Sequence, residues 1–573
     1  MKSKLINKLA IISLVLFLSA CSDYLEPTVI TEYTNEHVTK SYDITKQRVT
    51  AIYNRLQQGF NPVGGTTDGA MLASASDESE HTLETSPIQN FNVGSWNSFS
   101  NPDDVWGYYY QSIRMANQYL ASNAVETVDL DRQKYDPSTS KVYEIFLAEV
   151  VRWDYEVRFL RAYFYLELVK RYGGVPLLTE ALPLDYDVSK VTRNTLKECV
   201  DFIVSECDIV AQNLPGSYSN ADLGRATKGA AFALKSRVLL YAASDLFNTA
   251  SWAGGYSNVE LIAMPQANRA ERWRQAANAA KAIIDLSTPG YLLANNYDGP
   301  FLTDGFKNNN EVIFSVRGGA TNDFEKNNIS VGYNKGRSGT APSQNLVDAY
   351  EMKDGSKFNW NNADHAKNPY VNRDNRLGQS IVFNNISFKG RPIESWEGGQ
   401  DGYPVPHASK TGYYLKKYVN ENLDLLTDKT AVHSWIVFRL AEMYLNYAEA
   451  LNEVEPGNSD ITFYINKLRR RGGLVDLPAS LSQDETREKI RNERRVELAF
   501  EEHRTWDVRR WMIAPSTLGV PLRGVKVQKK DDGSFLYTSV NLENRTFSDK
   551  MYLYPVPQGE VEVASGILQN PLW

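Results

Sequence analysis

The clearest pattern of apolar and polar positions lies between residues 195 and 214. Its apolar residues recur every three or four positions, which places them on one face of an α-helix: Leu196, Val200, Ile203, Cys207, Val210 and Leu214. Thr195 and Glu198 have the spacing of an N-terminal capping box, and Pro215-Gly216 supplies a stop. The pattern therefore predicts one amphipathic helix with two defined ends.

Similar spacing predicts further helices before residue 290. They cover about 46–58, 105–120, 157–168, 230–241 and 273–283. Gly173-Gly174, with Pro176 just beyond, gives the third of these a C-terminal stop. Paired helices joined by loops favour a helical-repeat array, in which each pair is buried against the next, although no repeat of fixed length is present.

The pattern changes between residues 291 and 434. Asn, Gly and Asp become frequent, and short apolar runs such as 311–316 predict strands. A stretch of this length is too long for one structureless loop, so we expect short strands and function there. Helices return after residue 435. One is marked by Val437, Leu440, Tyr444, Tyr447 and Leu451, and another is capped by Ser482 and Glu485 and runs to about Trp511. We therefore expect three regions, 41–290, 291–434 and 435–573.

The first twenty residues have the layout of a bacterial secretory signal. Three lysines precede an apolar run at 9–18 and the small pair Ser19-Ala20. About ten apolar residues are too few to span a bilayer. Residues 18–21, Leu-Ser-Ala-Cys, look like a lipobox, which implies lipidation of Cys21 and a membrane anchor that does not cross. The alternative is an ordinary signal with an incidental cysteine. Residues 21–40 are polar and read as a flexible tether.

Charge and motifs exclude several functions. The net charge is −7, and it becomes −10 without residues 1–20, so nucleic acid is a poor partner.

Cys199 and Cys207 are eight residues apart on one predicted helix. That spacing is a rise of about 12 Å and too far for a disulfide, so we expect two free thiols. The sequence holds no zinc-protease, phosphate-loop, dinucleotide or serine-hydrolase motif, and it predicts no cofactor and no catalytic residue. Asp- and Asn-rich loops suit calcium, but solvated turns have the same composition, so no metal site is predicted.

Four motifs occur in order along the chain. They are residues 158–165 with 172–176, residues 439–450, residues 493–501 with Arg504, Asp507, Arg510 and Trp511, and the ending 568–573. Residues 370–376 add weaker support. Together with the lipobox-like segment these motifs resemble the SusD/RagB family of Bacteroidetes lipoproteins, over nearly the whole mature chain. Leu572 stands where family members often carry glycine.

The resemblance implies both a fold and a task. The fold is mostly α, with tetratricopeptide-like helix pairs that scaffold a loop-rich, short-strand ligand-binding region. The task is nutrient capture at the outer membrane, outside the cell, for a TonB-dependent transporter of the SusC type. The resemblance implies a binding protein rather than an enzyme. It also implies that the ligand is an oligosaccharide or a peptide.

One charged cluster allows two interpretations. Glu493, Glu497 and Glu501 share a helical face, and Arg494 and Arg504 are close in sequence. A pair of these carboxyls suits a glycosidase, whereas a structural ion network suits a scaffold. We favour the network, because neighbouring arginines keep carboxylates ionised and make them poor general acids.

Aromatic residues, at 12% of the chain, are the better indication of a ligand site. Flat rings can stack on the apolar C–H faces of sugars. Six tryptophans on or beside predicted helices read as core: Trp106, Trp153, Trp273, Trp435, Trp506 and Trp511. Trp96, Trp360 and Trp396 lie in polar loops and are the proposed sugar platforms, although a loop tryptophan often just fills the surface. Trp96 is the first choice, with Asp77, His81 and Asn101 as partners for hydroxyl groups.

Three other functions remain open from the sequence. They are peptide capture, a lipid-anchored glycoside hydrolase, and a structural protein that grips partners through the helical array. The resemblance suggests ligand loops before the helix near residue 105 and after residue 290. Net negative charge favours neutral or cationic ligands, unless a local basic patch overrides it.

Overall fold

Two units are present along the chain. The computed structural model describes residues 35–60, 69–130, 140–218, 222–302 and 309–573, so the signal and Cys21 lie outside the described residues. One unit comprises residues 1–48 and 122–150, and the other comprises residues 49–121 and 151–573. Within the described ranges, no helix combines the length and the apolar character needed to cross a bilayer.

The first unit is small and helical. It holds α2 (Asn35–Lys40), α6 (Ala124–Thr127), and the beginnings of α3 (Tyr42–Tyr53) and α8 (Ser140–Tyr172). The ring of Tyr42 stacks on Phe146 at 4.3 Å, and its hydroxyl donates to Glu149. Helix α2 occupies the last six positions of the predicted tether, so those positions are not a flexible coil.

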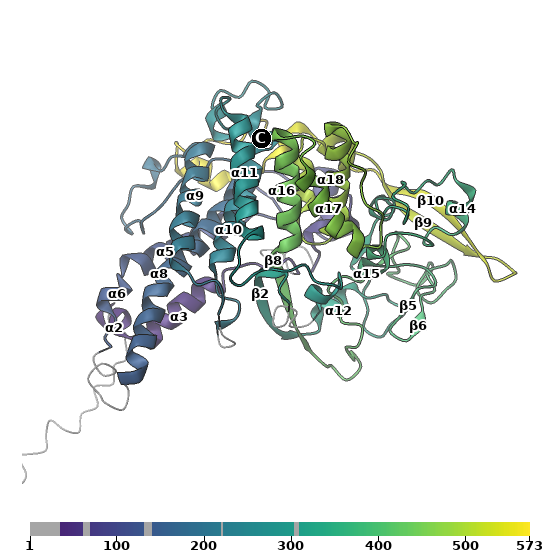
Figure 1. Ribbon diagram of the computed structural model, residues 1–573, viewed down its shortest axis with the longest axis horizontal. Helices are drawn as coiled ribbons and strands as arrows, with labels where there is room; N and C mark the ends of the chain where they lie inside the picture. The colour runs from purple at the N-terminus through teal and green to yellow at the C-terminus, as the bar shows by residue number, and fades with distance from the viewer. Residues whose placement is uncertain (1–34, 61–68, 131–139, 219–221, 303–308) are drawn as a thin grey trace, which may run out of the picture. The chain divides into compact units, whose positions relative to one another are not determined.

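The second unit is built on a row of helices (Figure 1). In chain order they are α5 (Trp106–Ala121), the end of α8, α9 (Leu196–Asn213), α10 (Lys228–Ala243), α11 (Arg269–Ile284), α16 (Leu440–Val454), α17 (Ser459–Arg471) and α18 (Gln483–Glu497). Helix α10 packs between α9 and α11, and α16 packs against α11, α17 and α18. Thr195 and Ser482 form the two predicted capping boxes. The helical prediction is confirmed, and the arrangement is tetratricopeptide-like.

The loop-rich region is inserted between two neighbouring helices of this row. Helices α11 and α16 pack against each other although residues 285–439 separate them in sequence. Strand β2 (Val312–Thr321) pairs antiparallel with β8 (Ala431–Arg439), so that Val312 lies opposite Arg439. The first and last strands of the insertion therefore meet at one place beside the helices.

Short elements fill the rest of the insertion and the C-terminal part. Inside the insertion are η7 (Gly299–Phe301), α12 (Asp323–Asn328), β3 (Thr340–Pro342), α13 (Gln344–Val347), α14 (Ala363–Lys367), α15 (Arg376–Ser380), β4 (Ile381–Val382), β5 (Ser387–Phe388), β6 (Arg391–Pro392) and β7 (Tyr414–Leu415). After α18 come α19 (Arg504–Arg510), α20 (Ala514–Thr517), the hairpin β9 (Leu522–Lys529) and β10 (Phe535–Glu543), η8 (Asp549–Tyr552) and α21 (Gln558–Val563). The remaining elements are η2 (Leu72–Ala75), β1 (Ser79–His81), α4 (Gln89–Val93), η3 (Val188–Lys190), η5 (Asp245–Asn248) and η6 (Val259–Leu261).

Several predicted helices have different bounds. The helix expected over 46–58 is α3, which runs from Tyr42 to Tyr53, and the helix expected over 157–168 is part of α8, which begins at Ser140. Val437 belongs to β8, and the helix after it begins only at Leu440. The helix predicted from Ser482 to Trp511 is also wrong in its middle, because α18 ends at Glu497 and α19 begins at Arg504. The chain turns between them with Phe500 at φ 62° and Glu502 at φ 60°, a left-handed conformation that no α-helix contains.

The acidic cluster around Glu497 is a structural ion network, as predicted. Glu497, on α18, accepts hydrogen bonds from Arg376 at 2.7 Å, from Arg439 at 2.6 Å and from Arg471. Burial alone would raise the pKa of the Glu497 carboxyl, but the three guanidinium groups outweigh it and hold that pKa well below its usual range. The pKa of Glu493 is raised instead. Burial raises it, and this effect exceeds the opposite effect of Arg376 and a second arginine.

The network extends from Glu497 to neighbouring carboxylates. Arg439 also binds Glu311 at 2.8 Å and Glu501 at 2.7 Å, and Lys417 donates to Glu501 at 2.6 Å. These side chains are at most 2% exposed. Since Arg439 ends β8 and Glu311 precedes β2, the network attaches both strands of the insertion to α18.

The core contains the residues that the pattern assigned to it. The six helix-associated tryptophans are all buried: Trp106, Trp153, Trp273, Trp435, Trp506 and Trp511. Cys199 and Cys207 are buried free thiols, as their helical spacing predicts.

Arg471→Gln is expected to lower the free energy of unfolding by about 3–5 kcal/mol, because it leaves Glu311 and Glu497 buried with one cation fewer. Arg470, its neighbour on α17, provides a matched control. Its side chain is 64% exposed and pairs with Asp476, so Arg470→Gln should leave stability nearly unchanged. Urea denaturation followed by circular dichroism measures both variants, and equal effects would contradict the assignment.

Candidate ligand-binding site

A pocket of about 640 Å³ opens where the insertion meets the segment before α5. The described residues that line it come from four places along the chain. They are positions 81–83, Asn327 in α12, positions within the loop 331–339, and His407. Both expected locations of ligand loops, before the helix near residue 105 and after residue 290, thus contribute to one pocket.

Strand pairing fixes one wall of the pocket. Strand β1 pairs antiparallel with β3, so that His81 lies opposite Thr340. The next residue, Thr82, donates from its backbone nitrogen to the Gly339 carbonyl at 2.9 Å and from its hydroxyl to the Ser338 carbonyl at 2.5 Å. Segments some 260 residues apart in sequence therefore form a single wall.

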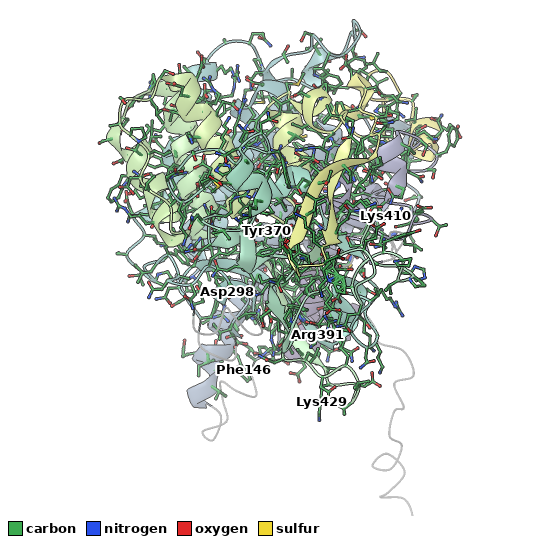
Figure 2. The ribbon with its side chains drawn as sticks, turned by 90° about the vertical axis from the view of Figure 1, so that its right-hand side faces the viewer. Phe146, Asp298, Tyr370, Arg391, Lys410 and Lys429 are labelled. Atoms are coloured by element: carbon green, nitrogen blue, oxygen red, sulfur yellow. The ribbon has the colours of Figure 1, made fainter. Side chains whose placement is uncertain are left out.

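The loop 331–339 is held by one buried carboxylate, Asp401. It accepts hydrogen bonds from the Ser330 hydroxyl at 2.5 Å and from Arg391 at 2.6 and 2.9 Å. Arg391 also donates to the Gly332 carbonyl at 3.1 Å, and a Cβ on Gly332 would lie 2.1 Å from Asp401 Oδ1. Only glycine therefore allows this approach at position 332. Figure 2 labels Arg391 on the side of the protein that holds these loops.

The charge state of Asp401 follows from these contacts. Burial would raise the pKa of its carboxyl, but the hydrogen bonds from Arg391 and Ser330 outweigh burial and lower that pKa. Asp401 is therefore ionised at neutral pH and works as an anchor for the loop.

His81 presents a defined face to the pocket. The residue is 4% exposed, and its Nδ1 accepts a hydrogen bond from the Leu83 backbone nitrogen at 3.3 Å. Since Nδ1 accepts, the neutral ring carries its proton on Nε2, which faces Gly339. His81 was predicted as a site residue, and the structure does place it in the pocket.

Trp96, the first choice as a sugar platform, is not exposed. The residue is 1% exposed, and its ring packs against Phe91, Tyr554 and Trp573 at centroid distances of 4.7–5.0 Å. The prediction of an exposed ring is wrong here, because partners from the far end of the chain cover it. None of the described residues that line the pocket is Trp, Tyr or Phe.

The other predicted residues lie outside this pocket. Asp77 is 5% exposed, and its carboxylate is bound by Arg504 at 2.7 Å and by Arg495 at 2.6 Å, so it is not available to a hydroxyl group. Asn101 holds a local turn by accepting from the Asp103 nitrogen at 3.0 Å.

Two predicted tryptophans keep part of their ring surface exposed. Trp360 is half-buried, and its Nε1 donates to Asp348 at 3.1 Å. Trp396 is also half-buried, with the Lys529 amine 4.8 Å from its ring centroid. Neither lines the pocket, so the structure does not gather the predicted platforms around one ligand.

Arg337, Asn327 and His407 line the candidate pocket and were not predicted from the sequence. Each was within the region expected to carry function, and Arg337 lies in the glycine-rich run 336–339. No periodicity or motif connects them with His81, because a long-range strand pair brings them together.

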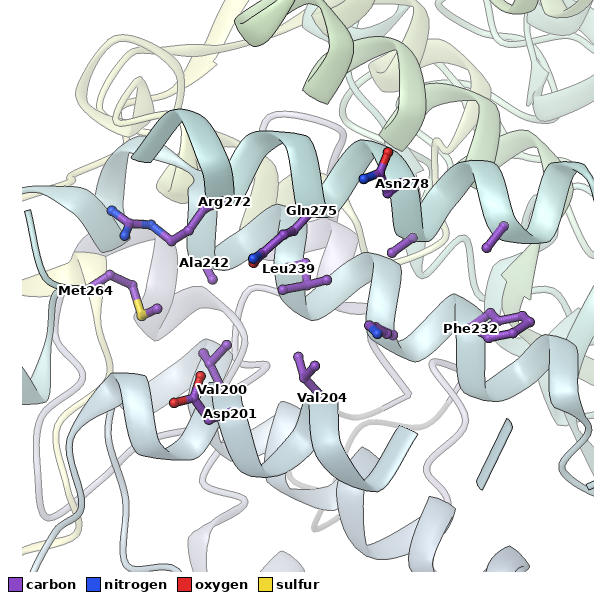
Figure 3. A pocket seen from close by; sticks show the side chains of 13 residues that line it. Val200, Asp201, Val204, Phe232, Leu239, Ala242, Met264, Arg272, Gln275 and Asn278 are labelled. Atoms are coloured by element: carbon purple, nitrogen blue, oxygen red, sulfur yellow. The ribbon is translucent and has the colours of Figure 1, made fainter. Parts of the chain in front are cut away.

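Other hollows in the second unit differ in chemistry. Figure 3 shows a pocket of about 480 Å³ between α9, α10 and α11, with Val200, Val204, Phe232 and Leu239 as apolar lining. A larger hollow of about 910 Å³ includes Asp77 and many charged groups that neutralise one another, such as Asp348 with Arg523 at 2.6 Å. Among the described residues, no cluster of three or more His, Cys, Asp or Glu is placed to hold a metal ion.

Two sequence models of known families match the chain. One, described as the SusD family, matches residues 306–573. The other, described as starch-binding and associating with the outer membrane, matches residues 43–240. Among curated proteins, SusD-like protein P25 of Formosa agariphila is 24% identical, over 99% of this chain and 98% of that protein.

Solved structures of SusD-like proteins are also similar to this chain. A SusD-like protein of Bacteroides fragilis has a TM-score of 0.77 at 29% identity, over 94% of this chain and 99% of that one. A SusD-like carbohydrate-binding protein of the same organism has a TM-score of 0.74 at 22% identity, over 92% and 99%.

Asp401→Asn is expected to speed hydrogen exchange of the backbone amides between residues 331 and 339, because an amide cannot replace the ionised acceptor of Arg391 and Ser330. The lowered pKa means that the stabilisation is present at neutral pH and is lost as the pH falls below about 4. The difference from wild type in thermal stability should therefore shrink in acid. Asp428→Asn is the control. Asp428 is exposed and lies outside the loop, but it pairs with Lys335, which is in the loop. Unchanged exchange in Asp401→Asn would contradict the anchoring role.

Proposed function

Because the chain belongs to the SusD/RagB family, we propose that it is a glycan-binding lipoprotein of the bacterial outer membrane. In this proposal Cys21 carries the lipid anchor, and the protein faces the cell exterior. It captures an oligosaccharide and delivers it to a TonB-dependent transporter of the SusC type. The family membership supports the transporter as partner, and the pocket supports the choice of ligand.

The observation that carries the proposal is the pocket of about 640 Å³ at the insertion. Its volume is within the range of small-ligand sites, about 300–1,000 Å³. Arg337, Asn327 and His407 offer polar groups, and Leu83 and Val331 offer apolar surface. A sugar ring presents both kinds of surface, with oxygen atoms at its edge and C–H groups on its faces. Asp401 and the β1–β3 pair hold the loop before any ligand binds, which lowers the entropy cost of binding.

Binding without cleavage fits this pocket better than hydrolysis. A glycoside hydrolase places two carboxyl groups about 5–10 Å apart around the bond that it cleaves. Among the described residues that line the pocket, none is Asp or Glu. The acidic cluster at Glu497 is buried in ion pairs and is no substitute. We therefore propose a binding protein rather than an enzyme.

The proposal is tested by calorimetry on a soluble form without residues 1–21. We expect heat from one class of oligosaccharide, no heat from peptides, and no new reducing ends after long incubation. Release of reducing ends would instead establish a hydrolase, and heat from peptides alone would establish peptide capture.

His407→Ala is expected to weaken glycan binding about twofold to twelvefold, the effect of losing one hydrogen bond of about 0.5–1.5 kcal/mol. His407 is exposed and lines the pocket, so its removal should not disturb folding. His365→Ala is the matched control, since that ring stacks on Phe358 at 5.4 Å outside the pocket. The same calorimetric titration compares both variants, and equal affinities would place the ligand elsewhere.

A further inference from the structure

We propose that the pocket binds a sugar that carries a negative charge, a carboxylate or a sulfate group, and that Arg337 binds this charge. The inference rests on the proposed function, because it concerns the ligand of the same pocket. It also reverses the expectation from net charge, which favoured neutral or cationic ligands.

The ionisable groups of the pocket are all basic. Arg337, His81 and His407 line it, and none of its other described lining residues is ionisable. A guanidinium group has five N–H donors and no acceptor. A neutral sugar hydroxyl both donates and accepts, so it is best bound where carboxylates or carbonyls accompany the donors. A carboxylate or sulfate only accepts, so it matches the donor-only guanidinium group of Arg337 more fully than a hydroxyl group does.

Arg337 differs from the cations around it in having no carboxylate partner among the described residues. Its one described contact is with a neutral amide oxygen, Asn327 Oδ1, at 3.3 Å. Neighbouring cations are paired: Lys335 with Asp428 at 2.6 Å, Arg391 with Asp401, and Lys410 with Glu84. The charge of Arg337 is therefore not neutralised by any carboxylate of the described residues, and it is open to solvent.

Packing directs Arg337 toward the pocket. The amide of Asn327 is confined, since a Cβ on Gly69 would lie 2.6 Å from its nitrogen. Asn327 thus holds its oxygen toward Arg337, and both residues line the pocket. A fixed acceptor limits the rotamers of the arginine, which lowers the entropy cost of placing its remaining donors on an anion.

The acidic character of the chain does not extend to the insertion. Residues 291–434 carry 16 Lys and Arg against 16 Asp and Glu, whereas the whole chain carries 62 against 69. An approaching anion therefore meets a region without net negative charge. Because Arg337 is exposed, its attraction should weaken with added salt, as expected for a solvent-accessible charge.

The test compares matched charged and neutral glycans with Arg337→Gln. The probes are oligogalacturonate and its methyl ester, a sulfated galactan oligosaccharide and its desulfated form, and a neutral laminarin oligosaccharide. We expect one charged probe to bind at least about tenfold more tightly than its neutral form. Arg337→Gln should remove most of that difference, and raised salt should reduce it. Which of the two charged probes binds distinguishes carboxylate from sulfate.

Lys335→Gln is the matched control, because it removes an equal charge from the same loop at a residue that does not line the pocket. It should keep the preference for the charged probe. The inference is overturned if neutral glycans bind as tightly as charged ones and Arg337→Gln changes nothing, and glycan capture would then still stand. If the folded protein binds none of these probes and no other glycan, the proposed function fails as well.

Discussion

Three guanidinium groups converge on the buried carboxylate of Glu497, and the second unit depends on that contact. The arginines come from α15, from the end of β8 and from the end of α17, so one residue of α18 joins the helical row to the insertion. A buried ion network adds little net stability compared with apolar packing of equal size, because desolvation offsets its attraction. We infer that its main effect is specificity: a displaced strand or helix would leave a buried charge without a partner.

The loops that form the pocket are positioned by the attachment of the insertion to α18. Strand β2 follows Glu311 and strand β8 ends at Arg439, both residues of the network, and the loops of the insertion lie between these two strands in the sequence. Among these loops Asp401 has the same role on a smaller scale, since it fixes the loop 331–339 through Arg391 and Ser330. The scaffold therefore positions a ligand site without supplying the site's own chemistry.

Local signals in the sequence determine much of the helical row and little of the pocket. The helix after Thr195 was predictable because its cap, its apolar face and its stop are all adjacent in sequence. Val437 was misplaced because its spacing to Leu440 and Tyr444 fits a helix, whereas pairing with β2 makes it part of a strand. Trp96 lies in a polar loop, and its ring packs against nearby Phe91 and also against Tyr554 and Trp573, which are more than 450 residues away. Arg337 lines the candidate pocket through contacts that no local pattern encodes.

The position of the insertion has a consequence for how such proteins diversify. Its first and last strands, β2 and β8, are neighbours, and α11 and α16 pack as though nothing lay between them. Loop length between two fixed, adjacent ends costs little free energy. The length and surface chemistry of the insertion can therefore change while the flanking helices α11 and α16 keep their contacts. Selection can thus alter the surface chemistry of the insertion without altering the helices that hold it.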